Sequence, residues 1–66
     1  MISDRDIYRT ASIMIREFGS KAHIQAAMRA DEFLEQGDLD GQRLWLRIIK
    51  AIEELRSTDR GDAPLN

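Results

Sequence analysis

The 66-residue sequence contains no cysteine. This absence excludes disulfide bonds and metal sites built from thiolates, and it fits the reducing cytoplasm, where we expect the protein to be located. The single histidine, His23, has no second histidine or cysteine with which to share a metal ion. We expect its ring to be packed or partly exposed near the start of a helix. The sequence therefore predicts neither a metal nor a cofactor.

Long hydrophobic runs are also missing. No segment approaches the roughly 20 apolar residues of a membrane-spanning helix, and the N-terminal segment MISDRDIYRT lacks the apolar core of a signal peptide. The formal net charge of −2 gives no global attraction to nucleic acid. The sequence has no glycine-rich phosphate loop, nucleophile elbow or zinc motif. We therefore predict neither a membrane protein nor an enzyme.

The sequence does show clear helical periodicity between Leu44 and Leu55. Apolar residues recur there at three- and four-residue spacing, whereas a strand would alternate. At about 100° per residue, the apolar stripe spans roughly 160°, which is wide enough to contact two neighbouring helices. Leu46 is the exception because it falls on the charged side. We expect this segment to form the centre of the fold, with Ile48 and Ile52 shielded from water.

Two more amphipathic segments precede the central one. We predict an all-α fold, a small three-helix bundle with short connections, with helices at about 3–18, 20–36 and 40–56. The domain is expected to occupy residues 1–56. Residues 57–66 are polar and contain a glycine and a proline, so we predict a flexible, disordered tail there.

Helix ends are marked by a few residues. Ser3 is a suitable N-cap for the first helix, and Ser20 for the second. Gly19 and Gly37 are expected to end the first and second helices with a left-handed backbone. Asp38 or the nearby Asp40 is the expected N-cap of the third helix.

The second helix carries a ridge of small residues at Ala22, Ala26 and Ala30, continued by Phe33. Small side chains let another backbone approach closely. We therefore expect this ridge to face a neighbouring helix.

Some apolar residues fall outside the main helical stripes. We define a candidate partner surface from these residues and the tryptophan: Ile13, Ile24, Met28, Trp45 and Leu46. Single exposed apolar residues are common, but a contiguous patch marks a contact site. A chain this short also buries only about 60% of its unfolded surface. The sequence thus favours a protein–protein interaction module that associates with a second copy or with an unidentified partner protein.

Three arginines, Arg5, Arg9 and Arg16, cluster on one face of the first helix near Ser12. They are the candidate anion-binding residues. A second basic stripe follows the last helix at Arg43, Arg47 and Lys50. The alternative function is therefore a nucleic-acid-binding accessory protein. However, no aromatic residue lies between the arginines to stack on bases, and solvated helix faces explain both stripes, so nucleic acid is the less favoured partner.

Four short motifs lie between Ala26 and Leu55: Met28-Arg29-Ala30-Asp31, Gly37-Asp38, Gly41-Gln42 and Trp45-Leu46-Arg47-Ile48. In this combination the segment resembles a family of small bacterial all-helical proteins of unassigned function. The resemblance covers about half of the chain. It implies a compact cytoplasmic protein, and it brings no catalytic or binding residues to this sequence.

Overall fold

The computed structural model describes residues 3–60, with side chains described up to Ser57. Within this range the elements are helical: α1 (Asp4–Phe18), the short 3₁₀-helix η1 (Gly19–Lys21), α2 (Ala22–Glu35) and α3 (Leu39–Arg60). The described residues contain no strand, so the predicted all-α class is confirmed. None of the described helices is both long enough and apolar enough to cross a membrane.

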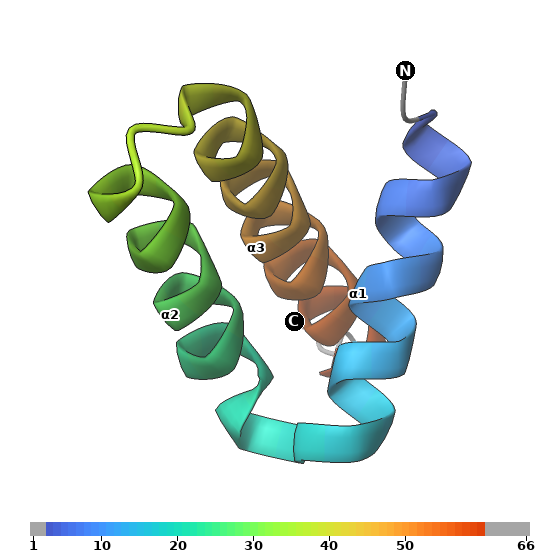
Figure 1. Cartoon of the computed structure of the whole chain (residues 1–66). Helices are drawn as coiled ribbons and strands as arrows, with labels where there is room; N and C mark the ends of the chain where they lie inside the picture. The colour runs from blue at the N-terminus through green and yellow to red at the C-terminus, as the bar shows by residue number, and fades with distance from the viewer. Residues whose placement is uncertain (1–2, 61–66) are drawn as a thin grey trace.

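The arrangement is built around α3. α1 and α2 diverge from the turn at η1, and α3 runs behind both of them (Figure 1). α3 packs against α2 most extensively and against α1 next, whereas α1 and α2 touch each other little. The part of the chain with the longest apolar stripe is therefore the element that holds the other two helices together.

The predicted caps of α1 are confirmed. Ser3 Oγ accepts a hydrogen bond from the Asp6 backbone N–H at 3.3 Å, which satisfies one of the free donors at the helix start. At the other end, Gly19 has a φ of 57°, and its N–H donates to the Ile15 carbonyl. Ser20, in contrast, does not cap α2. The residues Gly19–Lys21 form η1 instead, and α2 begins at Ala22 without a side-chain cap.

The connection between α2 and α3 is fixed by a Schellman motif. Gly37 has a φ of 80°, its N–H donates to the Leu34 carbonyl at 3.0 Å, and the Asp38 N–H donates to the Phe33 carbonyl at 2.9 Å. Asp38 then caps α3, because its Oδ1 accepts from the Gly41 N–H at 2.9 Å. Of the two predicted N-cap candidates, Asp38 is the correct one.

The core is small and rich in alanine. Its buried members come from all three α-helices: Ile7, Ala11, Ala22, Ala26, Ala30, Ile48, Ala51 and Ile52. The expected burial of Ile48 and Ile52 and the inward-facing alanine ridge of α2 are confirmed. Next to this ridge, a Cβ placed on Gly41 would lie only 2.5 Å from Phe33 Cδ1. A side chain at position 41 would therefore overlap the Phe33 ring where α3 starts.

The C-terminal end of α3 differs from the prediction. The helix was expected to end at residue 56, but it continues to Arg60. The apolar stripe ends at Leu55, but no glycine or proline lies between Gly41 and Gly61 to disfavour the helical backbone. The last core residue therefore does not mark the end of the helix. The rest of the predicted tail, residues 61–66, lies outside the described residues.

Candidate functional site

The candidate partner surface does not form a single patch. Ile13 and Trp45 meet in an apolar groove of about 360 Å³ between α1 and α3. This groove is lined by Asp6, Ile7, Arg9, Thr10, Ile13, Leu44, Trp45 and Ile48. Ile13 is exposed and Trp45 is partly buried against the core. The groove therefore contains two of the five residues that the sequence singled out.

Ile24 and Met28 lie elsewhere, on the outer face of α2. At about 100° per residue, they fall roughly 180° from Ala22, Ala26 and Ala30, which are the buried residues of this helix. They point away from α3 and from the groove. Leu46 is exposed on α3 and does not line the groove. The predicted surface thus divides among the groove, Leu46 on α3 and an outer helix face. We call this face, together with Lys21 at the end of η1, the α2 outer face (Lys21, Ile24, Met28 and Asp31).

The three arginines of α1 do not lie at one site. Arg5 and Arg9 line a shallow depression together with Tyr8 and Ser12. Arg16, in the last turn of α1, does not line it. None of the three arginines forms an ion pair within the described part of the chain. The depression is open and both of its arginines are exposed, so it is a weak anion site.

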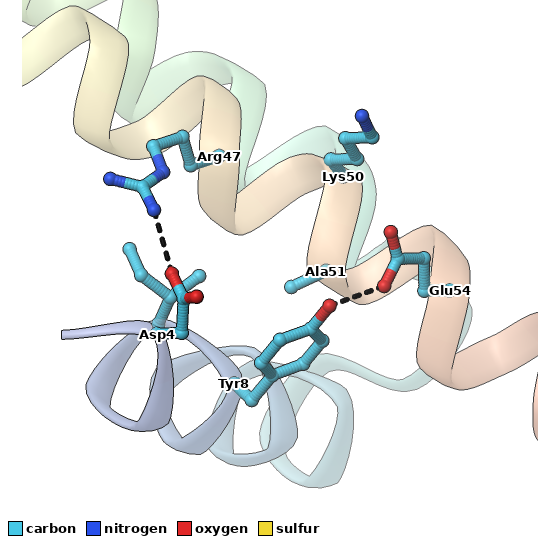
Figure 2. Close-up of a pocket in the computed structure, with 7 residues that line it drawn as sticks. Asp4, Tyr8, Arg47, Lys50, Ala51 and Glu54 are labelled. Carbon is cyan, nitrogen blue, oxygen red and sulfur yellow. Dashed lines mark hydrogen bonds and ion pairs between the residues drawn. The ribbon is translucent and has the colours of Figure 1, made fainter.

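A polar pocket that sequence reasoning missed lies between α1 and α3 (Figure 2). Its volume is about 270 Å³, and it is lined by Asp4, Ile7, Tyr8, Arg47, Lys50, Ala51 and Glu54. Arg47 Nη2 lies 2.7 Å from Asp4 Oδ1, and the Tyr8 hydroxyl donates a hydrogen bond to Glu54 Oε1. Within the basic stripe of α3, Arg47 is therefore paired with Asp4 in an exposed ion pair.

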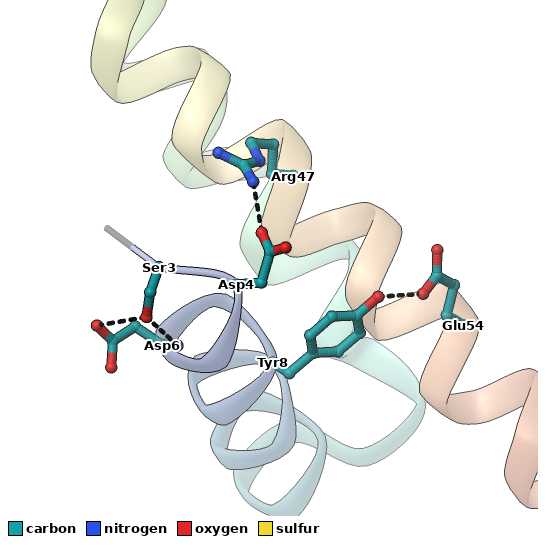
Figure 3. A network of polar contacts seen from close by, with 6 residues as sticks. All are labelled: Ser3, Asp4, Asp6, Tyr8, Arg47 and Glu54. Atoms are coloured by element: carbon teal, nitrogen blue, oxygen red, sulfur yellow. Dashed lines mark hydrogen bonds and ion pairs between the residues drawn. The ribbon is translucent and has the colours of Figure 1, made fainter. Parts of the chain in front are cut away.

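These contacts form part of a longer polar network at the start of α1 (Figure 3). Ser3 and Asp6 interact within the N-cap, at 3.3 Å between Ser3 Oγ and Asp6 Oδ2. Asp4 lies one residue further and reaches α3 through Arg47. Asp4 and Tyr8 are one helical turn apart on α1, and Arg47 and Glu54 are two turns apart on α3, so each pair shares one face of its helix. Pairing them required knowledge of how α1 crosses α3, which the sequence does not supply.

A further polar contact joins α2 to α3. His23 Nε2 lies 3.1 Å from Glu53 Oε2, with both side chains about half exposed. His23 thus ties two helices together, and its ring is only partly exposed, as the sequence predicted. Among the described residues, no group of three histidine, cysteine or acidic side chains is placed to hold a metal ion.

The environment of Tyr8 has a measurable consequence. The hydrogen bond that its hydroxyl donates to Glu54 raises the pKa of Tyr8, as do partial desolvation and the nearby negative charges of Glu54 and Asp4. The raised pKa means that the native state keeps this proton more tightly than the unfolded chain does. The associated stabilisation is fully present below a pH of about 10, the ordinary tyrosine value, and is lost as the pH rises through the folded-state pKa.

We expect Glu54→Ala to lower the titration midpoint of Tyr8 towards the ordinary value of about 10, because it removes the largest cause of the raised pKa while the charge of Asp4 and the partial desolvation remain. Glu54→Gln should give an intermediate midpoint, because an amide oxygen still accepts the hydrogen bond but carries no charge. Ultraviolet absorbance of tyrosinate measures this directly, since Tyr8 is the only tyrosine of the sequence. An ordinary midpoint in the wild-type protein would contradict the contact.

Comparisons with protein-family models, curated protein sequences and solved structures found no match. The resemblance of residues 26–55 to a family of small bacterial proteins therefore stays a prediction.

Proposed function

We propose that this chain is a small protein–protein interaction module that self-associates, with no catalytic activity. In this proposal α1, α2 and α3 act as a three-helix bundle whose role is to present a docking face. The observation that carries the proposal is an imbalance between the core and the surface. Among the described residues, the buried core holds three side chains larger than alanine, Ile7, Ile48 and Ile52. Eight large apolar side chains are exposed: Tyr8, Ile13, Phe18, Ile24, Met28, Leu34, Leu39 and Leu46.

This imbalance favours association because an alanine core provides little hydrophobic free energy. Burying one methylene group contributes about 0.8 kcal/mol, so each alanine contributes far less than an isoleucine. Small domains without disulfide bonds commonly gain the missing stability from a partner chain. A second copy that covers exposed apolar side chains stabilises the native state by mass action.

The free energy available from covering the exposed side chains indicates that association is reversible. Ile24 and Met28 are 58% and 52% exposed, so covering these two residues in both copies gains only the remaining half of their burial energy, roughly 3–6 kcal/mol in total. Association itself costs on the order of 4–15 kcal/mol. These side chains alone therefore support a weak, concentration-dependent dimer, and further contacts must contribute to its affinity.

We expect Met28→Asp to weaken self-association on the order of tenfold or more, because it places a charge where an apolar side chain becomes buried. The helix content should not change, since Met28 lies outside the core. Sedimentation velocity over a range of protein concentrations measures the effect. Ser12→Asp is the matched control, because it adds the same charge on an exposed polar position of α1. A wild-type protein that remains monomeric at high concentration would contradict the proposal.

The alternative function, a nucleic-acid-binding accessory protein, is supported only by the pair Arg5 and Arg9, which border one depression without acidic partners in the described chain. Salt-dependent binding to nucleic acid that is lost in Arg9→Glu would favour it. We further propose a cytoplasmic location, on the ground that the sequence contains no cysteine.

A further inference from the structure

The charges of α2 are arranged against its own helix dipole. A helix favours acidic residues near its N-terminus and basic residues near its C-terminus. In α2 the first turn has no acidic residue, the N-cap position is occupied by Lys21, and no side chain caps the helix. The last turn has no basic residue, while Asp31 and Glu35 occupy the C-terminal half. Both ends of α2 therefore carry the charge that an isolated helix disfavours.

These charges border the exposed apolar pair on the α2 outer face. Ile24, Met28 and Asp31 fall within an arc of roughly 60° at 100° per residue, and Lys21 precedes Ile24 by one turn. All four are exposed. Neither Lys21 nor Asp31 has an ion-pair partner in the described part of the chain. Glu35, which is also exposed, falls in the same arc about one turn beyond Asp31. Along the helix, the face therefore presents a cation, two apolar side chains and then two anions.

Such an order is self-complementary when two helices run antiparallel. We propose that a second copy of this chain docks on the α2 outer face, with the two α2 helices antiparallel and the two-fold axis at the level of residue 26. In this register Ile24 of one copy faces Met28 of the other, and Lys21 faces Asp31, each contact occurring twice. The inference rests on the proposed self-association and specifies its surface. α2 lies at one side of the molecule (Figure 1), and the side chains of this face are exposed.

Other arrangements of the same two helices are less favourable. A parallel pair would place Lys21 against Lys21 and Asp31 against Asp31, which is repulsive. Moving the antiparallel register by one turn keeps only one apolar pair. In one direction Met28 faces Met28 and Lys21 faces Glu35, but Ile24 faces the charged Glu32; in the other direction Ile24 faces Ile24, but Met28 faces Ser20. The axis at residue 26 is the one of these three registers that pairs both apolar residues and also pairs Lys21 with Asp31. It also places the N-terminal end of each α2, with its positive charge, beside the C-terminal end of the partner α2, with its negative charges.

Charge reversal tests this register. Lys21→Asp and Asp31→Lys should each weaken self-association on the order of tenfold at low salt, because each turns two attractive contacts into repulsive ones. The double variant, Lys21→Asp with Asp31→Lys, should return the dissociation constant to within about threefold of the wild type. At dilutions where the protein is monomeric, each single variant should unfold at the same or a higher temperature than the wild type, since each charge then agrees with the α2 dipole.

A variant that associates more weakly, although its monomer is as stable as the wild type, shows that the replaced residue acts in docking and not only in folding. If the wild type associates but both reversals leave its dissociation constant unchanged, the antiparallel α2 contact is wrong and self-association stands. If the wild type does not associate at any concentration, the proposed function fails as well. If the double variant associates more weakly than either single variant, the charge pairing is wrong.

Directed cross-linking gives a second, independent test of direction, because the sequence contains no native cysteine. Ile24→Cys and Met28→Cys proteins are mixed and mildly oxidised. The antiparallel register predicts that the mixed disulfide between the two variants forms faster than either homodimeric disulfide. A preference for the homodimeric disulfides would indicate parallel helices and overturn the proposal.

Discussion

Replacing Ile52 by alanine is expected to lower the free energy of unfolding by about 2–5 kcal/mol. Ile52 is 0% exposed and is the only large side chain that is fully buried among the described residues. Its neighbours cannot readily move into the vacated space, because Ala22, Ala26 and Ala51 already hold the helix backbones close together. The variant therefore loses both the transfer free energy of the side chain and the contacts around the resulting cavity.

The loss is large relative to the total stability. A domain of this size has a free energy of unfolding of roughly 3–10 kcal/mol, so Ile52→Ala should leave a substantial unfolded population at physiological temperature. Urea unfolding followed by Trp45 fluorescence, at a protein concentration where the chain is monomeric, measures the change. Leu46→Ala is the matched control on the same helix, because Leu46 is 48% exposed, and its effect should stay near 0.5 kcal/mol. Equal losses for the two variants would contradict the core as described.

The second large effect concerns Gly41 and Phe33. Glycine-to-alanine changes within a helix usually stabilise it by up to about 1 kcal/mol. At Gly41 the new Cβ would lie 2.5 Å from Phe33 Cδ1 and 2.8 Å from Cγ. Rotation of the ring about χ2 does not move Cγ, so it does not relieve the overlap; the Phe33 side chain must change its χ1 angle, or the backbones must separate. Overpacking of this kind costs about 1–3 kcal/mol, so we expect Gly41→Ala to destabilise the protein by about 1–2 kcal/mol overall.

The expected sign reverses when the ring is removed. In a Phe33→Ala background, Gly41→Ala should stabilise the protein by up to about 1 kcal/mol, because only the helix-propensity gain remains. Denaturant unfolding of the four proteins of this double-mutant cycle measures the coupling. If Gly41→Ala destabilises both backgrounds equally, the clash with Phe33 is not its cause.

Local features of this fold were predictable from the sequence. The Ser3 cap, the left-handed Gly19 and Gly37 and the Asp38 cap depend on neighbours within four residues, so the chain encodes them directly. The burial of Ile48 and Ile52 followed from helical periodicity. The Ser20 prediction failed because the same local sequence also permits a 3₁₀ turn, and the tight corner between α1 and α2 selected it.

Features that depend on how helices cross were not predictable. Asp4 and Arg47 are 43 residues apart, and nothing in the sequence identifies either as the partner of the other. The candidate partner surface shows the same limit. Periodicity correctly placed Ile24 and Met28 on one helix face, but it gave no means of placing Ile13 relative to them. The groove between Ile13 and Trp45 exists only because α1 crosses α3 at that level.

The unequal packing of α1 and α2 on α3 implies that the native state does not open uniformly. α2 and α3 are consecutive helices joined by a short turn, they share the alanine ridge, and they have the most extensive contact in the molecule. α1 is attached by a smaller interface, supplemented by the half-solvated contacts of Asp4 and Tyr8. Brief detachment of α1 should therefore precede global unfolding, so the backbone amides of α1 exchange with solvent sooner than those along the α2–α3 seam. The hairpin of α2 and α3 is then the most persistent unit of the chain, and it is also the unit that carries the α2 outer face.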